Sequence, residues 1–519
     1  MSKPVPLPFQ NLALSLSGGG YRAAAFHLGT LSYLNHAQWQ NKPLLQQLAV
    51  ISTISGGTIA GMKYCLCLAE GKSFEAYFQE LYAFLKKDNL LADALAILND
   101  SKAWQGSLKQ RNLINAFAQV YHRQLLDQKT FGMLQNLPHE KFPEMVFNST
   151  DLENQKAFRF QKSRRGLIGN GMIDVQETAA REIRLADIVA SSSCFPGGFE
   201  PLNFHLDFVA SDKSPLAEAW KEMQPLRLMD GGIVDNQGIE SVLLFEGRMD
   251  HDGQQPFIGT WLISDVTRKE LNFANAPGQE SNFFLNFSIR FYNSIALTVL
   301  TFSVMLLVLY DRKWITMLST FLMLISSMWL AAGYFIVKSV VGQLKKTVSK
   351  HASSIRNLGL IRSVKLKYVV AQVDTRINSL GRLPDVFMKR IRDQGYDNLY
   401  SDHDWRTRVK TNLIYDLLEK VPVSDELKVH VEKANQMGTT LWFSDEASGV
   451  RPSMLDALVI SGQATVCANL IKYLEDVRKN LYPKLPESLR AELDAFQASC
   501  RRDFERFNAE PGWMVHELS

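Results

Sequence analysis

The sequence predicts an α/β protein in which helices cover a mostly parallel sheet, together with two helices long enough to span a membrane. Three observations predict this architecture. Short apolar runs alternate with helical stretches over the first half of the chain, and two of those runs end in glycine-rich turns. Two long segments without any charged residue follow in the middle of the chain.

The composition supports a large globular body and excludes several other classes. The chain has 519 residues, of which 46% are hydrophobic and 21% charged, with only 18 prolines, so it is neither mostly disordered nor collagen-like. Its formal net charge of +4 is too small to indicate a nucleic-acid partner. The five cysteines are scattered, which indicates neither a disulfide framework nor a zinc site.

The strands of the predicted sheet are short apolar runs bounded by turn residues. Two of them lead directly into glycine-rich turns and small-residue helices, which is the order expected of strand, turn and helix in a parallel sheet. Later runs have the same character. The predicted strands are Leu12–Leu16, Leu48–Ile54, Met145–Ser149, Leu226–Met229 and Phe257–Val266, with Lys365–Val373 as a further strand beyond the uncharged segments.

The two uncharged segments predict a membrane hairpin. Phe291–Tyr310 has 20 residues and Trp314–Val337 has 24, and only three residues separate them. At about 1.5 Å per residue each helix reaches about 30 Å or more, which matches the hydrocarbon thickness of a bilayer. Two alternatives remain open, a pair of buried core helices and a re-entrant hairpin that does not cross the membrane.

The charges beside the hairpin predict its orientation. Six basic residues flank its outer ends, whereas the connecting loop has two. The amino-terminal segment Met1–Gln10 lacks the apolar core of a secretory signal. We therefore expect a protein of the cell (inner) membrane with two helices and both flanks in the cytoplasm. The flanking residues are Arg290, Lys338, Lys345, Lys346, Lys350 and Arg356, and the loop residues are Arg312 and Lys313.

A glycine run follows the first predicted strand. Gly18, Gly19 and Gly20 lie between that strand and a helix, where backbone N–H groups can hold an anion or a developing oxyanion. A dinucleotide would require an acidic residue about 20 positions later, but the first one in the chain is Glu70. A Walker loop is excluded because no Gly-Lys-Ser or Gly-Lys-Thr closes the turn. A merely tight turn remains an alternative.

The second predicted strand ends at Ser55, in the layout of a nucleophile elbow. A serine in a sharp turn between strand and helix exposes its hydroxyl only if the residues two positions before and after it are small. Gly57 meets this requirement, whereas Thr53 replaces the usual first glycine. The elbow is therefore predicted to be slightly more open than usual.

Asp230 is the best-placed partner for this serine. It ends an apolar run and precedes Gly231 and Gly232, whose tight turn would hold its carboxylate still. An ordinary turn is the alternative interpretation. Several of the ten histidines follow Asp230 in the chain, so the order of residues also leaves a Ser-Asp-His triad open.

Taken together, these blocks resemble the patatin-like phospholipases, here of a bacterial type with an inserted transmembrane hairpin. The family's ordered motifs are similar to Gly18–Arg22, Ser55–Gly57, Asp230–Gly232, Phe147–Leu152 and Asp187–Pro201. Val409–Leu413 resembles more loosely the family's Arg-Thr-x-Leu helix. This last similarity extends the expected fold beyond the hairpin.

The resemblance implies a three-layer α/β/α fold and a lipid acyl hydrolase with a Ser-Asp dyad, with no cofactor and no metal. Ser55 would attack an ester of a membrane phospholipid, and Asp230 would act as its base. The products would be a free fatty acid and a lysolipid. The resemblance further implies oxyanion donors at Gly18, Gly19 and Gly20, with Arg22 supporting their loop.

These expectations divide the chain into three parts. Residues 1–285 form the catalytic domain, residues 286–345 the hairpin, and residues 346–519 a mostly helical region that can complete the catalytic fold. The bilayer contact is assigned to residues 291–337, which would hold the enzyme against its substrate. The alternative functions are an acyltransferase, a catalytically silent membrane scaffold of the same fold, and a nucleotide- or anion-binding module.

Overall fold

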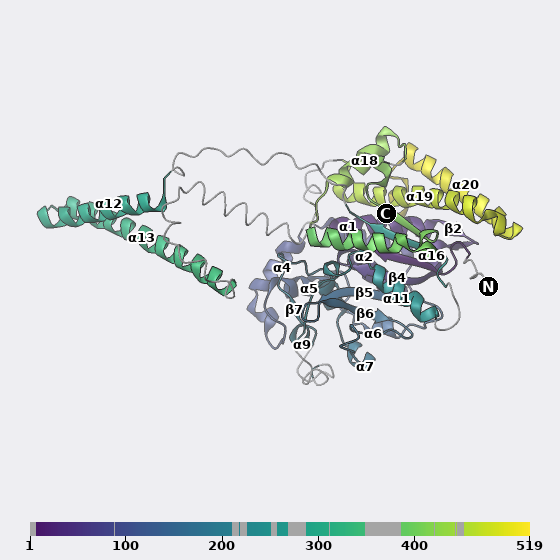
Figure 1. The fold of residues 1–519 in the computed structure, drawn as a ribbon, viewed down its shortest axis with the longest axis horizontal. Coiled ribbons are helices and arrows are strands. Elements are labelled where there is room, and N and C mark those ends of the chain that lie inside the picture. The colour runs from purple at the N-terminus through teal and green to yellow at the C-terminus, as the bar shows by residue number, and fades with distance from the viewer. Residues whose placement is uncertain are drawn as a thin grey trace. The chain divides into compact units, whose positions relative to one another are not determined.

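The computed structural model describes residues 7–87, 89–209, 217, 226–250, 257–267, 287–310, 312–347, 386–419, 421–441, 443 and 451–519. Its chain forms two compact units (Figure 1). The first combines Met1–Leu271 with Pro384–Ser519, and the second is Asn272–Leu383. The predicted strand Lys365–Val373 lies outside the described residues.

The first unit is built on an eight-stranded sheet. Its order is β10-β9-β1-β4-β5-β8-β7, and β6 pairs with the other edge of β5. The pairs along β10, β9, β1, β4 and β5 are parallel, whereas β6, β7 and β8 join by antiparallel pairs. The strands are β1 (Leu12–Leu16), β4 (Leu48–Ile54), β5 (Glu144–Asp151), β6 (Lys156–Lys162), β7 (Leu202–Asn203), β8 (Arg227–Asp230), β9 (Trp261–Asp265) and β10 (Val409–Leu413), and β2 (Gln38–Trp39) and β3 (Lys42–Pro43) form a separate ribbon.

The predicted α/β class and mostly parallel sheet are confirmed, with two corrections to the elements. The run predicted as Phe257–Val266 is a strand only over Trp261–Asp265. The segment Val409–Leu413, which resembled a helix of the family, is the edge strand β10 instead. Its backbone pairs with Trp261–Asp265 in parallel register, and this pairing extends the sheet with a strand from beyond the hairpin.

Alternating side chains of the strands supply two cores, one on each face of the sheet. Leu14, Leu16 and Ile51 belong to the larger core, which also contains the apolar side chains of α1 (Gly20–His36), α2 (Gly56–Ala69), α8 (Leu185–Ser192) and α19 (Met454–Asn480). The remaining helices of this unit are α3 (Phe74–Lys86), α4 (Leu90–Asn99), α5 (Leu113–Gln124), α6 (Gly132–Gln135), α7 (Glu177–Ala180), α9 (Phe204–Asp207), α16 (His403–Arg406), α17 (Asp416–Glu419), α18 (Asp425–Gln436), α20 (Glu487–Ala509) and α21 (Trp513–Leu518).

The opposite face of the sheet has a smaller core. Ala13, Val50 and Ile263 lie there with apolar side chains of α11 (Ile239–Asp250) and of the helix over residues 386–401. The two cores place the sheet between two helical layers. The three-layer α/β/α arrangement is therefore confirmed.

The region after the hairpin packs closely on the first part of the chain. Helices α1 and α19 pack against each other, and two glycines lie at their closest approach. A Cβ on Gly29 would stand 2.0 Å from the carbonyl oxygen of Val459, and one on Gly462 would stand 2.1 Å from that of Phe26. Only glycine permits this approach of two backbones, so α19 is an integral part of the first unit.

The second unit contains two long helices, α12 (Ile289–Leu309) and α13 (Lys313–Thr347), which pack against each other. Small residues of this pair are buried, and large apolar side chains are exposed; the buried ones are Ala296, Ser303, Ser319 and Ser326.

Three described helices are long and apolar enough to cross a membrane, namely Arg290–Leu309, Lys313–Ala331 and Met454–Asn480. The third is 83% buried in the first unit, whereas the other two are only 11% buried. Burial thus identifies Met454–Asn480 as a core helix.

Candidate active site

The register of β5 brings Ser55 and Asp230 together. Asn148 of β5 pairs with Ile54, the last residue of β4, and the next residue, Ser149, pairs with Asp230, the last residue of β8. Strands β4 and β8 therefore end opposite adjacent residues of β5. Ser55, which directly follows β4, and Asp230, which ends β8, therefore lie at the same point of the sheet.

Ser55 occupies a strained turn between β4 and α2. Its φ of 51° and ψ of −119° are unusual for a residue with a side chain, and its hydroxyl does not cap the helix. Close neighbours explain the two glycines that follow. A Cβ on Gly56 would stand 2.0 Å from the carbonyl oxygen of Gly20, and one on Gly57 would stand 2.3 Å from that of Leu16. The turn has the geometry of a nucleophile elbow.

A chain of hydroxyl groups supports this turn from below. The backbone N–H of Ser55 donates to Oγ of Ser192 at 2.9 Å, and the Ser192 hydroxyl donates to the carbonyl of Asn148 at 2.6 Å. Oγ1 of Thr58 lies 2.8 Å from Oγ of Ser192 and 3.0 Å from Oγ1 of Thr53. These bonds fix the backbone of Ser55 and leave its hydroxyl to face another group.

Thr53 fits the elbow because a residue on α2 is small. A Cβ on Gly61 would stand 2.5 Å from Cγ2 of Thr53, so the threonine methyl fills the space that Gly61 leaves. The hydroxyl of Thr53 meanwhile joins the chain of bonds below Ser55. The departure from a glycine at this position therefore has a local compensation.

Asp230 lies beside the Ser55 side chain. The Asp230 carboxylate accepts a hydrogen bond at 2.7 Å from the backbone N–H of Gly232. Burial raises the pKa of Asp230 to about 6, although the bond from Gly232 and the neighbouring Ser55 side chain both favour the charged form. A carboxylate with this pKa is ionised at neutral pH and can still accept a proton.

The carboxylate is also fixed through its backbone. Its N–H donates to the carbonyl of Cys194 at 3.0 Å, and its own carbonyl accepts from the Thr150 hydroxyl at 2.8 Å. A Cβ on Gly231 would stand 2.5 Å from the carbonyl oxygen of Asn148, which explains the first of the two glycines. The tight turn expected after Asp230 is present as a short 3-10 helix over Gly231–Ile233.

No histidine in the described part of the chain hydrogen-bonds to Ser55 or Asp230. His27 lies in the core, where its ring nitrogens meet Oγ of Ser264 and the carbonyl of Ser17, both at 3.0 Å. Burial lowers the pKa of His27 to about 4. This ring is therefore neutral at physiological pH and is held by structural bonds.

The glycine run lies at the start of α1, beside Ser55. Gly19 and Gly20 have φ values of 145° and 62°, which a residue with a side chain rarely adopts. The N–H of Gly18 donates to the backbone carbonyl of Asn236 at 3.1 Å. Among the described residues no acceptor faces the N–H groups of Gly19 and Gly20, so these two donors are available at the site.

Residues from beyond the hairpin hold this loop. The Arg22 guanidinium donates to the carbonyl of Met437 at 3.0 Å, and the N–H of Tyr21 donates to the carbonyl of Thr440 at 2.7 Å. Thr440 also lies against Gly20, where a Cβ would stand 2.5 Å from its carbonyl oxygen. Arg22 thus links the glycine loop to the carboxy-terminal part of the first unit.

Sequence reasoning singled out Ser55, Asp230, the three glycines and Arg22, and the structure brings all of them to one region. It missed several residues that shape the site: Thr58, Asn148, Ser192, Asn236, Met437 and Thr440. Asn148 and Ser192 do lie in blocks that resemble the family's motifs. Met437 and Thr440 act through backbone carbonyls, which leave no trace in side-chain identity.

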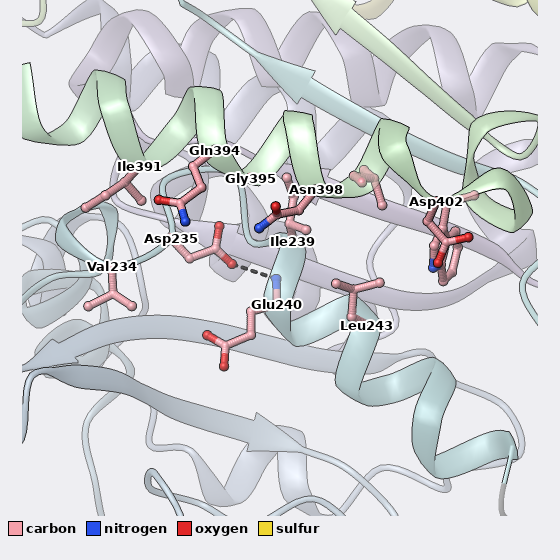
Figure 2. Close-up of a pocket in the computed structure, with 12 residues that line it drawn as sticks. Val234, Asp235, Ile239, Glu240, Leu243, Ile391, Gln394, Gly395, Asn398 and Asp402 are labelled. Atoms are coloured by element: carbon pink, nitrogen blue, oxygen red, sulfur yellow. Dashed lines mark hydrogen bonds between the residues drawn. The ribbon is translucent and has the colours of Figure 1, made fainter.

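A cavity of about 400 Å³ lies beside the site rather than at it. Figure 2 shows that it lies between α11, which supplies Ile239 and Leu243, and the helix over residues 386–401. At its edge the Asp235 carboxylate accepts the N–H of Glu240 at 2.8 Å (Figure 2). Neither Ser55 nor Asp230 lines this cavity.

A search of solved structures found several that are similar to this chain. Human GIVD cytosolic phospholipase A2 is 16% identical over 50% of this chain and 43% of that chain, with a TM-score of 0.32. Its complex with methyl γ-linolenyl fluorophosphonate is 20% identical over 44% and 35%, with a TM-score of 0.28. The chain thus spans less than half the length of these structures. The comparison with curated protein sequences gave no match.

A family model matches part of this sequence. The family model described as patatin-like phospholipase matches residues 14–243, which include the glycine loop, the elbow and the Asp-Gly-Gly turn. Residues 14–243 of this chain therefore form a patatin-like phospholipase domain, the domain of a family of lipid acyl hydrolases.

Proposed function

We propose that this protein is a membrane-anchored serine acyl hydrolase that releases fatty acids from phospholipids through a dyad of Ser55 and Asp230. One observation carries the proposal. A serine in a strained elbow lies beside a buried carboxylate whose charged form it favours, inside a patatin-like phospholipase domain.

In the acylation step, Oγ of Ser55 attacks the carbonyl carbon of the ester, and its proton moves to the Asp230 carboxylate. The pKa of about 6 makes Asp230 a suitable base, because the carboxylate is ionised at neutral pH and its pKa lies close to the working pH. When the tetrahedral intermediate collapses, the ester C–O bond breaks. Asp230 then gives the proton to the leaving alkoxide, and the lysolipid departs.

The negative charge that develops on the carbonyl oxygen requires donors near Ser55. The N–H groups of Gly19 and Gly20 are available for this role, and the amino-terminal end of α2 adds positive potential. Each donor of this kind is worth about 2.7–4 kcal/mol in the transition state. We assign Gly18 to the support of the loop, because its N–H is bonded to Asn236.

The deacylation step reverses these roles with water as the nucleophile. The water oxygen attacks the carbonyl carbon of acyl-Ser55 while Asp230 takes a proton from the water. The bond between Oγ and the acyl carbon then breaks. The proton returns from Asp230 to Oγ, and the fatty acid leaves. Atoms and charge balance without a cofactor or a further reactant.

The hairpin α12–α13 provides the proposed anchor. Its surface is rich in exposed apolar side chains such as Val308, Met317 and Met328, which are 79%, 76% and 70% exposed. Burying each CH₂ of an acyl chain in an apolar phase is worth about 0.8 kcal/mol, so lifting a whole lipid into water is slow. An enzyme held at the bilayer avoids this cost. The basic flanks favour a cytoplasmic catalytic domain that acts on the inner leaflet.

Lipid mass spectrometry tests the function. Cells that express the unaltered protein should accumulate lysolipid and free fatty acid relative to cells that express Ser55→Ala at the same level. The accumulating lysolipid identifies the head group and the acyl position that the enzyme prefers. Equal lipid profiles in the two strains, with both proteins folded and in the membrane, would contradict the proposal.

A further inference from the structure

Asn236 has a side chain that the proposed mechanism does not use. It lies six residues after Asp230 and is 1% exposed. Its backbone carbonyl accepts the N–H of Gly18, which ties the loop after β8 to the loop after β1. Among the described residues, neither the oxygen nor the nitrogen of its side-chain amide has a hydrogen-bond partner.

An unpaired amide at this depth is costly. Leaving a buried donor or acceptor unsatisfied costs about 1–3 kcal/mol, so such groups are rare in folded proteins. The neighbouring residue Gln237, which is equally buried, has its amide nitrogen bonded to the carbonyl of Arg392 at 3.2 Å. The same loop thus pairs one amide within the protein and leaves the other without a partner.

The amide of Asn236 lies close to both Ser55 and Asp230. The point where a Cβ of Gly18 would stand is 2.5 Å from Oδ1 of Asn236 and 3.2 Å from Cβ of Ser55. The corresponding point on Gly232 is 2.4 Å from the same Oδ1 and 2.9 Å from Oδ1 of Asp230. Glycine at both positions makes room for this amide, and a half-turn about χ2 exchanges its oxygen and nitrogen.

The dyad itself does not need the amide. The Asp230 carboxylate already accepts from the N–H of Gly232 and lies beside the Ser55 side chain, which favours its charged form. The group that arrives without partners is the carbonyl oxygen of the ester. Of the three glycine N–H groups expected to receive it, that of Gly18 is bonded to the backbone carbonyl of Asn236.

We propose that Asn236 is a further catalytic residue, whose side-chain N–H₂ donates a hydrogen bond to the oxyanion formed on the substrate. The inference rests on the proposed acyl hydrolase function. The backbone of Asn236 removes Gly18 from the set of donors, and its side chain replaces that donor. Because the full negative charge develops on the ester oxygen only in the transition state, this hydrogen bond is strongest there, which favours the transition state over the bound substrate.

The test compares Asn236→Leu with the matched control Gln237→Leu in the full-length protein, with p-nitrophenyl butyrate as substrate. Leucine is close to asparagine in size and has no donor. Asn236→Leu should lower the single-turnover acylation rate and kcat by about 10²- to 10³-fold with little change in KM. Its Tm should be equal or higher, because the unpaired amide is gone.

Gln237→Leu should show the opposite pattern, a lower Tm with kcat retained, because it removes a paired amide that does not face the dyad. The inference is overturned if Asn236→Leu keeps its acylation rate. It is also overturned if only deacylation slows, or if Tm falls as it does in the control. A Ser55→Ala protein that still hydrolyses the ester would instead refute the proposed function.

Discussion

The methyl group of Thr53 occupies the space that Gly61 leaves open on α2. A Cβ on Gly61 would stand 2.5 Å from Cγ2 of Thr53, which is closer than real contacts allow. The two residues therefore form a matched pair across the nucleophile elbow, in which the large residue lies on the strand and the small one on the helix. The effect of enlarging Gly61 should therefore depend on the size of the residue at position 53.

Gly61→Ala alone should destabilise the protein by about 1–3 kcal/mol, as overpacking of a core does. In a Thr53→Ser background, which keeps the hydroxyl bonded to Thr58 and removes the methyl, the same change should be neutral or stabilising. Thermal unfolding of the four proteins in a double-mutant cycle measures the coupling. If the two substitutions prove additive, Thr53 and Gly61 do not compensate each other.

The pKa of Asp230 predicts the pH dependence of the reaction. Burial raises this pKa from its usual value to about 6, and the base is active only when ionised. The kcat/KM for a soluble ester should therefore fall as the pH drops through about 6 and should be level above it. A pH–rate profile checks the midpoint. A profile that stays flat down to pH 4.5 would show that Asp230 is not the base.

The bond from Arg22 to Met437 predicts that the glycine loop depends on the carboxy-terminal region. Arg22→Lys keeps the positive charge and loses the planar guanidinium that reaches the carbonyl. The loop should then hold its oxyanion donors less well, which lowers kcat by about tenfold or more with a smaller change in KM.

Arg506→Lys is the control for this change, since it alters an exposed arginine paired with Glu517. Steady-state kinetics on both variants separate a local effect at the loop from a general effect of the substitution. An Arg22→Lys enzyme with the kcat of the control would remove the support for this role.

The hairpin makes a prediction about membrane attachment. Arginine near the middle of a spanning helix costs about 2.5–3.5 kcal/mol, whereas near an end its side chain reaches the interface. Leu297→Arg combined with Phe321→Arg should therefore release the protein from membranes in carbonate extraction. Val308→Arg, next to the end of α12, should leave it bound. Retention of the double variant in the membrane would argue against two spanning helices.

The sequence was sufficient for the strands that carry the glycine loop and Ser55. Leu12–Leu16 and Leu48–Ile54 are continuous apolar runs that end at glycine-rich turns, and β1 and β4 have the same bounds. A central strand of a parallel sheet is buried on both faces, so its whole run is apolar. Its end is then marked by the first residues that can turn.

The edge strand β10 was harder to predict because an edge strand is less buried than a central one. Only one of its long sides pairs with another strand, and Lys410 and Thr411 are partly exposed. Its apolar content is therefore low, and only the loose resemblance to a helix motif of the family pointed to an element here. The pairing with β9 depends on residues about 150 positions away, which a local pattern cannot reveal.

The arrangement of the site shows the same limit. Ser55 and Asp230 were identified by their turns, but their proximity depends on the adjacent pairings of Asn148 and Ser149 in β5. Asn236 gave no local signal, since an asparagine in a loop is common. Its depth and its missing partner become visible only when the loops after β1 and β8 are in place.

The most direct test of the dyad is the site of covalent labelling by a lipid-like fluorophosphonate. Peptide mass spectrometry of the treated full-length protein should find the phosphonyl group on Ser55, with labelling absent in Ser55→Ala and strongly slowed in Asp230→Asn. A label on a different serine, or undiminished labelling of the Ser55→Ala protein, would contradict the account.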